Sequence, residues 1–163
     1  MKLRLICVGK LSADWQQQAA ADYGARLKHY FPVEIVELKE EKGGRKGDTA
    51  GLVRREGERI LKQIPAPARV VILDEKGTNP TSEKLAGQLQ NEMLHGGRDW
   101  CLIIGGPYGL ATIVRQRAEQ TLSLSAMTLT HQVARILLLE QLYRAATIIN
   151  NEPYHNRLGM VRA

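Results

Sequence analysis

Short apolar runs alternate along the chain with longer amphipathic stretches. The runs are bounded by glycine, proline or charged residues, a pattern typical of strands covered by helices on both faces of a parallel sheet. Strands are predicted over 3–8, 33–38, 70–73 and 100–104, and helices from Ser12 or Asp14 to Tyr30, from Asp48 or Thr49 to Ile64, and over 81–95, 111–120 and 131–149. The alternation predicts an α/β fold with a mainly parallel sheet and helices on both faces.

The helix predicted over 81–95 has four apolar residues that are expected on its buried side: Leu85, Leu89, Met93 and Leu94. The third strand is expected to end at Asp74, at the edge of the sheet where parallel α/β proteins place their ligands. Residues 122–129 form a last apolar segment, interpreted as a strand, whose polar members are hydroxyl residues instead of charges.

Length and composition narrow the class of protein. With 163 residues and 44% hydrophobic content, the chain can bury one core, and a single domain over 1–163 is expected. No apolar run approaches the roughly 20 residues that cross a bilayer, and Lys10 follows the first run too soon for a signal peptide, so we expect a cytoplasmic protein. The net charge of +6 fits a polyanionic partner and fits simple solubility equally.

The stretch 39–47 is a predicted loop with four basic residues: Lys39, Lys42, Arg45 and Lys46. It is either a solvated connection or a basic arm that contacts phosphates. Cys7 and Cys101 lie in predicted strands and are interpreted as reduced core residues, with a catalytic thiol as the alternative. The histidines are scattered and no ligand spacing is present, so no metal is expected.

A turn with three glycines in five residues, 105–109, follows the strand 100–104. It lacks the spacing of a dinucleotide fingerprint, and Pro107 removes an N–H donor that a phosphate would use. Beside the uncharged segment 122–129, such a turn suits a neutral, hydrogen-bonding ligand such as an adenine ring. An ordinary tight turn is the alternative.

The end of the chain carries a second group of candidate residues. Glu140 and Arg144 are spaced for an i, i+4 ion pair on the last helix, which on its own indicates only a surface contact. Tyr154 and His155 then offer an aromatic face and an imidazole, groups that bind unpaired RNA bases. A tail that is merely packed or disordered is the alternative.

Four motifs in order resemble the RlmH (YbeA) family of SPOUT-class methyltransferases. They are Leu-Ile-Ile-Gly-Gly-Pro-Tyr-Gly-Leu at 102–110, Leu-Ser-Leu-Ser-Ala-Met-Thr-Leu-Thr-His at 122–131, Glu-Gln-Leu-Tyr-Arg-Ala at 140–145 and Pro-Tyr-His at 153–155. The resemblance runs over nearly the entire chain. Thr130 stands where relatives often have proline, and Asn156–Ala163 extend past the usual end.

The resemblance implies a homodimeric enzyme with a trefoil knot near its C-terminus and S-adenosylmethionine as its cofactor. The substrate implied is 23S rRNA in the assembled ribosome, methylated at N3 of a pseudouridine in helix 69, with neither membrane nor metal involved. Cofactor contacts then fall on Leu73, Gly105, Leu124, Ser125, Ala126, Met127, Thr128 and Leu129. Arg144, Tyr154 and His155 match positions of substrate handling and activity, and His155 is the hypothesised general base.

Two other functions remain open on the sequence. An RNA-binding factor that kept the fold without catalysis accounts equally well for the charge and the tail. A nucleotide-dependent oxidoreductase has only the strand and helix alternation in its favour, because the fingerprint is missing. Binding of S-adenosylmethionine or NAD separates these possibilities from the methyltransferase.

Overall fold

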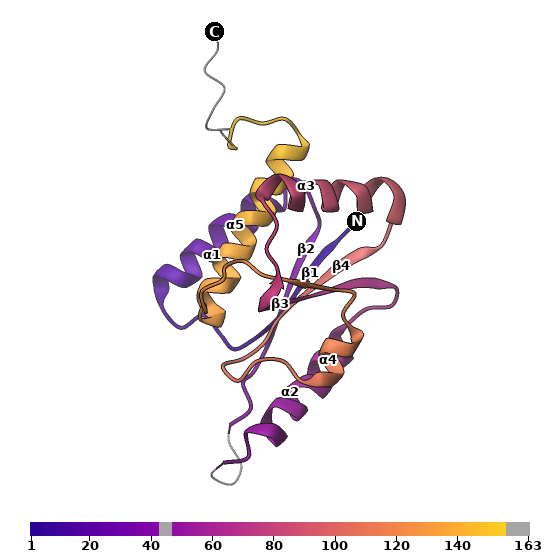
Figure 1. Ribbon diagram of the computed structural model, residues 1–163. Helices are drawn as coiled ribbons and strands as arrows, with labels where there is room; N and C mark the ends of the chain where they lie inside the picture. Colours follow the sequence, from indigo (N-terminus) through magenta and orange to yellow (C-terminus); the bar gives the residue numbers. More distant parts are fainter. Residues whose placement is uncertain (43–46, 156–163) are drawn as a thin grey trace.

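A five-stranded parallel sheet forms the centre of the computed structural model, which describes residues 1–42 and 47–155 (Figure 1). Its order is β2-β1-β4-β3-β5. The strands are β1 (Leu3–Val8), β2 (Val33–Leu38), β3 (Ala68–Thr78), β4 (Asp99–Ile104) and β5 (Gln120–Leu122). The helices are α1 (Asp14–Leu27), α2 (Thr49–Gln63), α3 (Ser82–Asn91), the π-helix η1 (Glu92–Gly96), α4 (Thr112–Arg117) and α5 (His131–Ile149).

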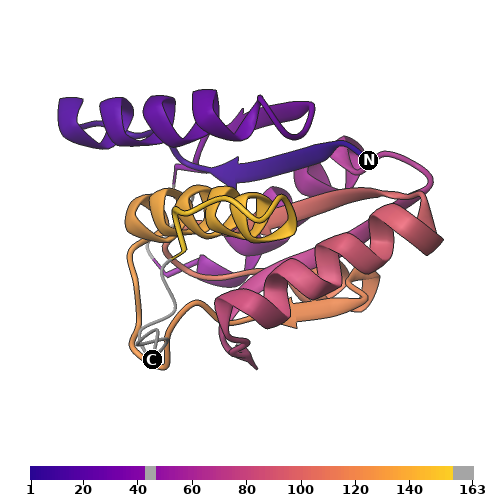
Figure 2. The same cartoon turned by 90° about the horizontal axis from the view of Figure 1, so that it is seen from above.

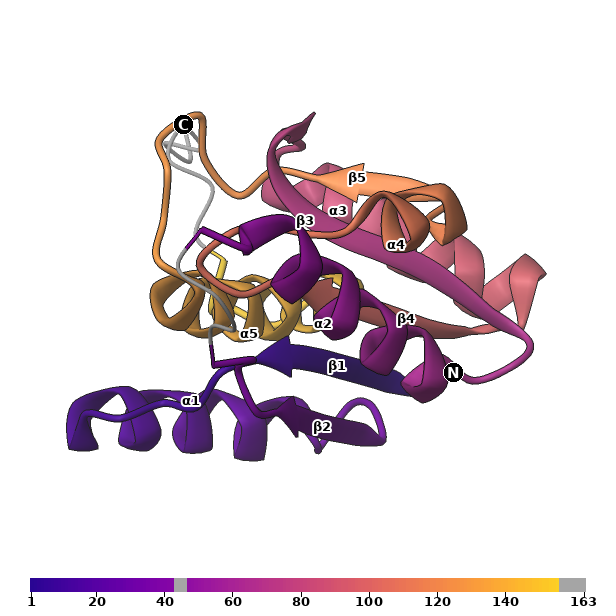
Figure 3. The ribbon, with the colours of Figure 1, turned by 90° about the horizontal axis from the view of Figure 1, so that it is seen from below.

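Helices cover both faces of this sheet, as predicted. On one face α5 packs between α1 and α3 (Figure 2), and on the other α2 packs against α4 (Figure 3). Side chains alternate between the two cores along each inner strand, because successive residues of a strand point to opposite faces. In β4, Trp100, Leu102 and Ile104 enter the core under α5, whereas Cys101 and Ile103 enter the core under α2.

The third and last strands differ from the prediction. β3 continues beyond Asp74 to Thr78, because its far end pairs with Leu122 of β5 after a bulge that starts at Leu73. The segment 122–129, predicted as a strand, is mostly irregular, and the strand stops at Leu122. The helix α4 ends at Arg117 instead of continuing to 120 because β5 begins there.

The prediction of four buried residues in the helix over 81–95 was wrong for the two at its end. Leu85 and Leu89 are buried as expected, but Met93 and Leu94 are exposed. The wider π-helical turn of η1 rotates the chain, so that Glu92 is buried instead. Its carboxylate lies 3.2 Å from the Arg69 guanidinium, which compensates the buried charge.

The connections after the strands create a crevice at the carboxyl edge of the sheet. β3 leads to α3 on one face and the neighbouring β4 leads to α4 on the other, so the two loops diverge. Residues 123–130, the crossing segment, run from β5 at one edge of the sheet to α5, which starts beside Gly9 after β1 and Glu40 after β2. The crossing segment therefore passes over the ends of β3 and β4.

Arg45 and Lys46 of the predicted basic loop and the tail 156–163 lie outside the described residues.

Burial in the central strand predicts where truncation is costly. We expect Leu102→Ala to lower the free energy of unfolding by about 2–5 kcal/mol, because the side chain is fully buried in β4 and its loss leaves a cavity. Leu94→Ala, which removes the same atoms from a side chain that is 70% exposed, should change stability by less than about 0.5 kcal/mol. Urea unfolding at one protein concentration measures both, and equal losses would contradict the assigned core.

Candidate functional site

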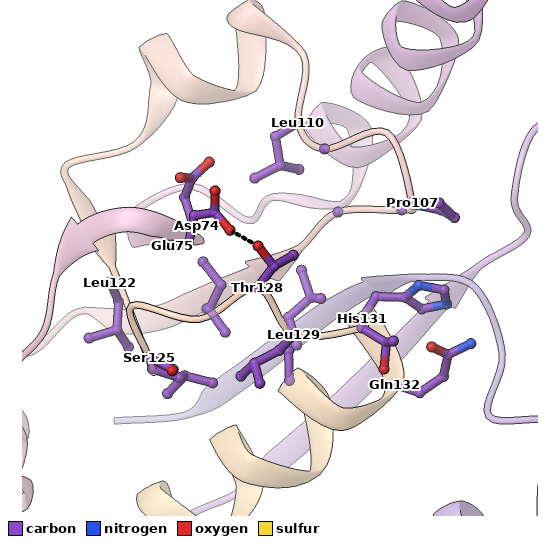
Figure 4. A pocket seen from close by; sticks show the side chains of 18 of the residues that line it. Asp74, Glu75, Pro107, Leu110, Leu122, Ser125, Thr128, Leu129, His131 and Gln132 are labelled. Carbon is purple, nitrogen blue, oxygen red and sulfur yellow. Dashed lines mark hydrogen bonds between the residues drawn. The ribbon is translucent and has the colours of Figure 1, made fainter.

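A cavity of about 510 Å³ opens at the carboxyl ends of β3 and β4, between the glycine turn and the crossing segment (Figure 4). Its size falls in the range of pockets for small organic ligands. Most of its lining is apolar and comes from the strand ends and the crossing segment: Leu73, Ile104, Leu110, Leu122, Leu124 and Leu129.

The glycine turn forms one wall of the cavity with its backbone. The Gly109 N–H donates to the Gly106 carbonyl at 3.0 Å. Gly109 has a φ of +81°, a backbone conformation that residues other than glycine rarely adopt. A Cβ atom at Gly105 would stand only 3.0 Å from the Gly109 carbonyl oxygen. Glycine at these positions therefore lets the loop close tightly and leaves its peptide groups accessible to a ligand.

The crossing segment forms the opposite wall and also offers peptide groups. Ser123 Oγ donates to the Ser125 carbonyl at 2.8 Å, and the Met127 N–H donates to Ser125 Oγ at 2.9 Å. Within the described residues, the bond from the Met127 N–H is the one intramolecular hydrogen bond that a backbone N–H group of residues 124–129 donates. The other N–H groups are left for water or a ligand, which suits a ligand recognised by its hydrogen-bonding edge.

Three titratable side chains line the cavity. Asp74 pairs with Arg115 at 2.6 Å, and the Lys76 N–H together with that guanidinium holds the pKa of Asp74 below its ordinary value. Glu75 accepts a hydrogen bond from Thr128 Oγ1 at 2.5 Å, drawn in Figure 4. Burial lowers the pKa of His131, although Glu40 at 3.3 Å opposes this effect.

The structure gathers most of the expected cofactor residues around this cavity. Leu73, Gly105, Leu124, Ser125, Met127, Thr128 and Leu129 all line it, whereas Ala126 lies in the same segment but outside the lining. Glu75 and His131 were not singled out by the sequence as parts of this site. Glu75 follows a residue expected to end its strand, and the position of His131 depends on where the crossing segment delivers α5.

The second group of expected residues forms a cluster at the other end of α5. Arg144 pairs with Glu140 at 2.6 Å, as predicted, and its guanidinium lies 4.7 Å from the centre of the Tyr154 ring. The Tyr154 hydroxyl donates to Glu140 at 3.1 Å, and burial raises the pKa of that hydroxyl. His155 lies 3.0 Å from Glu83 at the start of α3.

This tail cluster, Arg144, Tyr154 and His155 with Glu140 and Glu83, does not line the cavity. Arg144 follows His131 by thirteen residues on one continuous helix. At 1.5 Å per residue, this separates the tail cluster from the cavity by roughly 20 Å along the helix axis. One chain therefore holds the two groups of candidate residues apart.

Several other chemistries find no support in the described residues. Both cysteines are buried, and burial raises the pKa of each thiol to about 11, which disfavours the reactive thiolate. Residues 1–42 and 47–155 contain no group of three or more His, Cys, Asp or Glu side chains placed to hold a metal ion. No helix in these ranges is long and apolar enough to span a membrane.

Comparisons with known proteins agree with one another. A family model described as "Predicted SPOUT methyltransferase" matches residues 1–155. A ribosomal RNA large subunit methyltransferase H from Syntrophotalea carbinolica is 56% identical, over 96% of this chain and 100% of the relative. One of the same name from Pelobacter propionicus is 47% identical over the same shares. A probable methylase family protein from Haemophilus influenzae has a similar fold, with a TM-score of 0.53 at 14% identity over 95% of this chain and 70% of that one.

The lowered pKa of His131 predicts a pH dependence of stability. The unfolded chain takes up the imidazole proton near pH 6.5, whereas the folded protein takes it up only at lower pH. Stability should therefore decrease as the pH falls from about 6.5 through the folded pKa, and His131→Gln should reduce that decrease. His29→Gln, which removes an exposed imidazole, is the control and should leave the slope as it is. Urea midpoints between about pH 7.5 and pH 5 measure it, and identical slopes for wild type and His131→Gln would contradict the assignment.

Proposed function

We propose, from the premise that this chain belongs to the SPOUT methyltransferase family, that it methylates N3 of a pseudouridine in helix 69 of 23S rRNA with S-adenosylmethionine as methyl donor. The observation that carries the proposal is the cavity walled by the glycine turn and the crossing segment. The relatives named large-subunit rRNA methyltransferases match over their whole length, which supports the same substrate here.

The cavity fits the proposed cofactor in size and in chemistry. Leucine side chains offer an apolar surface to an adenine ring, and the free peptide groups of 124–129 offer hydrogen bonds to its edge. The residues that would hold it are those of the lining, Leu73, Gly105, Leu124, Ser125, Met127, Thr128 and Leu129. Ala126, in the same segment, would contribute through its neighbours. When bound, S-adenosylmethionine supplies an electrophilic methyl group on a sulfonium.

The protein's task in this reaction is to orient the nucleophile and to accept a proton. N3 bonds to the methyl carbon, the sulfur retains the electron pair of the broken C–S bond, and the N3 proton leaves to a base. We assign that base to His155. Arg144 and Tyr154 would hold the RNA, through a charge-assisted contact to phosphate and by stacking on a base.

The separation of the two groups of residues supports a homodimer. Within one chain the tail cluster is roughly 20 Å from the cavity, too far for His155 to reach a nucleotide at the cofactor. If two α5 helices pack antiparallel, the tail cluster of one subunit comes beside the cavity of the other. Leu137 supplies exposed apolar surface on α5 for such a contact.

The proposed ribosomal substrate supports a cytoplasmic location. The trefoil knot expected from the family resemblance stays a prediction, as does the action on intact ribosomes. An RNA-binding factor without catalysis would bind the same ribosomes without transferring a methyl group, so a methylation assay separates the two.

Methyl transfer and the role of the glycine turn can be tested together. The purified protein should transfer methyl groups from labelled S-adenosylmethionine to ribosomes lacking the modification, with the mark found in helix 69 by mass spectrometry. Gly109→Ala should weaken cofactor binding about tenfold or more, because alanine is strained at a φ of +81°. Gly87→Ala on α3, where a Cβ meets open space, should bind normally. A wild-type protein that neither binds the cofactor nor methylates ribosomes would exclude the proposed function.

A site shared between two subunits can be tested with a pair of complementary variants. His155→Gln should slow methylation by about 10²- to 10⁴-fold and flatten its pH profile, if the imidazole accepts the proton. Mixed and re-equilibrated with Gly109→Ala, and assayed with S-adenosylmethionine well below the concentration that saturates Gly109→Ala, it should recover about a quarter of the wild-type rate, since half of the dimers then have one intact site of two. A mixture as inactive as its components would show that each site is built from one chain.

A further inference from the structure

The cavity wall carries one carboxylate that no cation neutralises within the described residues. Asp74 is compensated by Arg115 at 2.6 Å. Glu75, the next residue, lies within 4.0 Å of no Lys, Arg or His nitrogen in the described chain, and its hydrogen-bond partner there is the uncharged Thr128 hydroxyl. The cavity therefore has an excess negative charge on the side where β3 leaves the sheet.

The position of Glu75 directs this charge toward the ligand space. It lies in the irregular part of β3 between Leu73 and Thr78, where the ladder to β5 is interrupted. Its bond to Thr128 joins the sheet to the crossing segment, and both residues line the cavity (Figure 4). The carboxylate thus stands between the two elements that form the pocket.

Resting on the proposed function, we propose that Glu75 makes the cavity prefer a cationic methyl donor over the neutral thioether that remains after transfer. Loss of the methyl group leaves its bonding electron pair on sulfur, so the ligand's net charge falls by one. A fixed carboxylate on the wall attracts the sulfonium form and gains nothing comparable from the thioether. Glu75 would thereby favour binding of fresh donor and release of spent product.

The size of the effect follows from the exposure of the side chain. Glu75 is exposed, so water and salt screen its charge, and we expect a contribution of about fivefold to the affinity ratio at low salt. The contribution should shrink as ionic strength rises. A carboxylate that only anchored the crossing segment would instead support both ligands equally and show little dependence on salt.

Calorimetric titration of the full-length protein with S-adenosylmethionine and with S-adenosylhomocysteine tests this role. Glu75→Gln removes the charge and keeps an amide oxygen that can accept from the Thr128 hydroxyl. It should weaken binding of the sulfonium compound about fivefold and change binding of the thioether less than about twofold. Thr128→Val is the matched control, because it removes the hydrogen bond and keeps the charge, so the affinity ratio should stay at the wild-type value.

The outcomes separate this inference from the function on which it rests. If the wild type binds both compounds and Glu75→Gln weakens both by the same factor, Glu75 has no charge-selective role although the cofactor site stands. The same holds if the ratio in wild type is unaffected by raising the salt concentration and matches that of Glu75→Gln. If the wild type binds neither compound, the proposed function fails and the inference fails with it.

Discussion

The passage of residues 123–130 across the carboxyl edge of the sheet is the constraint on which the cavity depends. At its start the Ser123 N–H donates to the Thr78 carbonyl at 2.8 Å, which ties it to β3. At its end the Thr130 hydroxyl accepts from the Val133 N–H and caps α5. Held at both ends, the segment runs without strand pairing over the ends of β3 and β4, and most of its residues line the cavity. The glycine turn closes that space from the other side.

The sequence predicted the individual strands and helices more accurately than the contacts between them. Unbroken apolar runs such as Trp100 to Ile104 identified the buried strands, because only a sheet covered on both faces buries every residue of a strand. Sequence could not show that β3 extends past Asp74, since the extension depends on pairing with β5, nor that a π-helical turn buries Glu92 and exposes Leu94. The contribution of Glu75 and His131 to the cavity depends on contacts between segments far apart in the chain.

The family resemblance contributed what physical patterns alone did not. A charge-free segment beside a glycine turn suited a neutral hydrogen-bonding ligand, but from the turn alone an ordinary tight turn was the favoured interpretation. The structure shows that the glycine turn lines a cavity. The proposals of the methyl donor and the rRNA substrate depend on the relatives. The distance between the tail cluster and the cavity adds a constraint, namely that one chain does not bring its own His155 to its own cavity.

A crystal structure of the protein grown with S-adenosylmethionine tests the central claim most directly. The account predicts density for the adenosyl group between Gly105 and the residues Leu124 to Leu129, with hydrogen bonds from their peptide groups to the adenine edge. A cavity closed by protein side chains, or the compound bound elsewhere on the molecule, would contradict it.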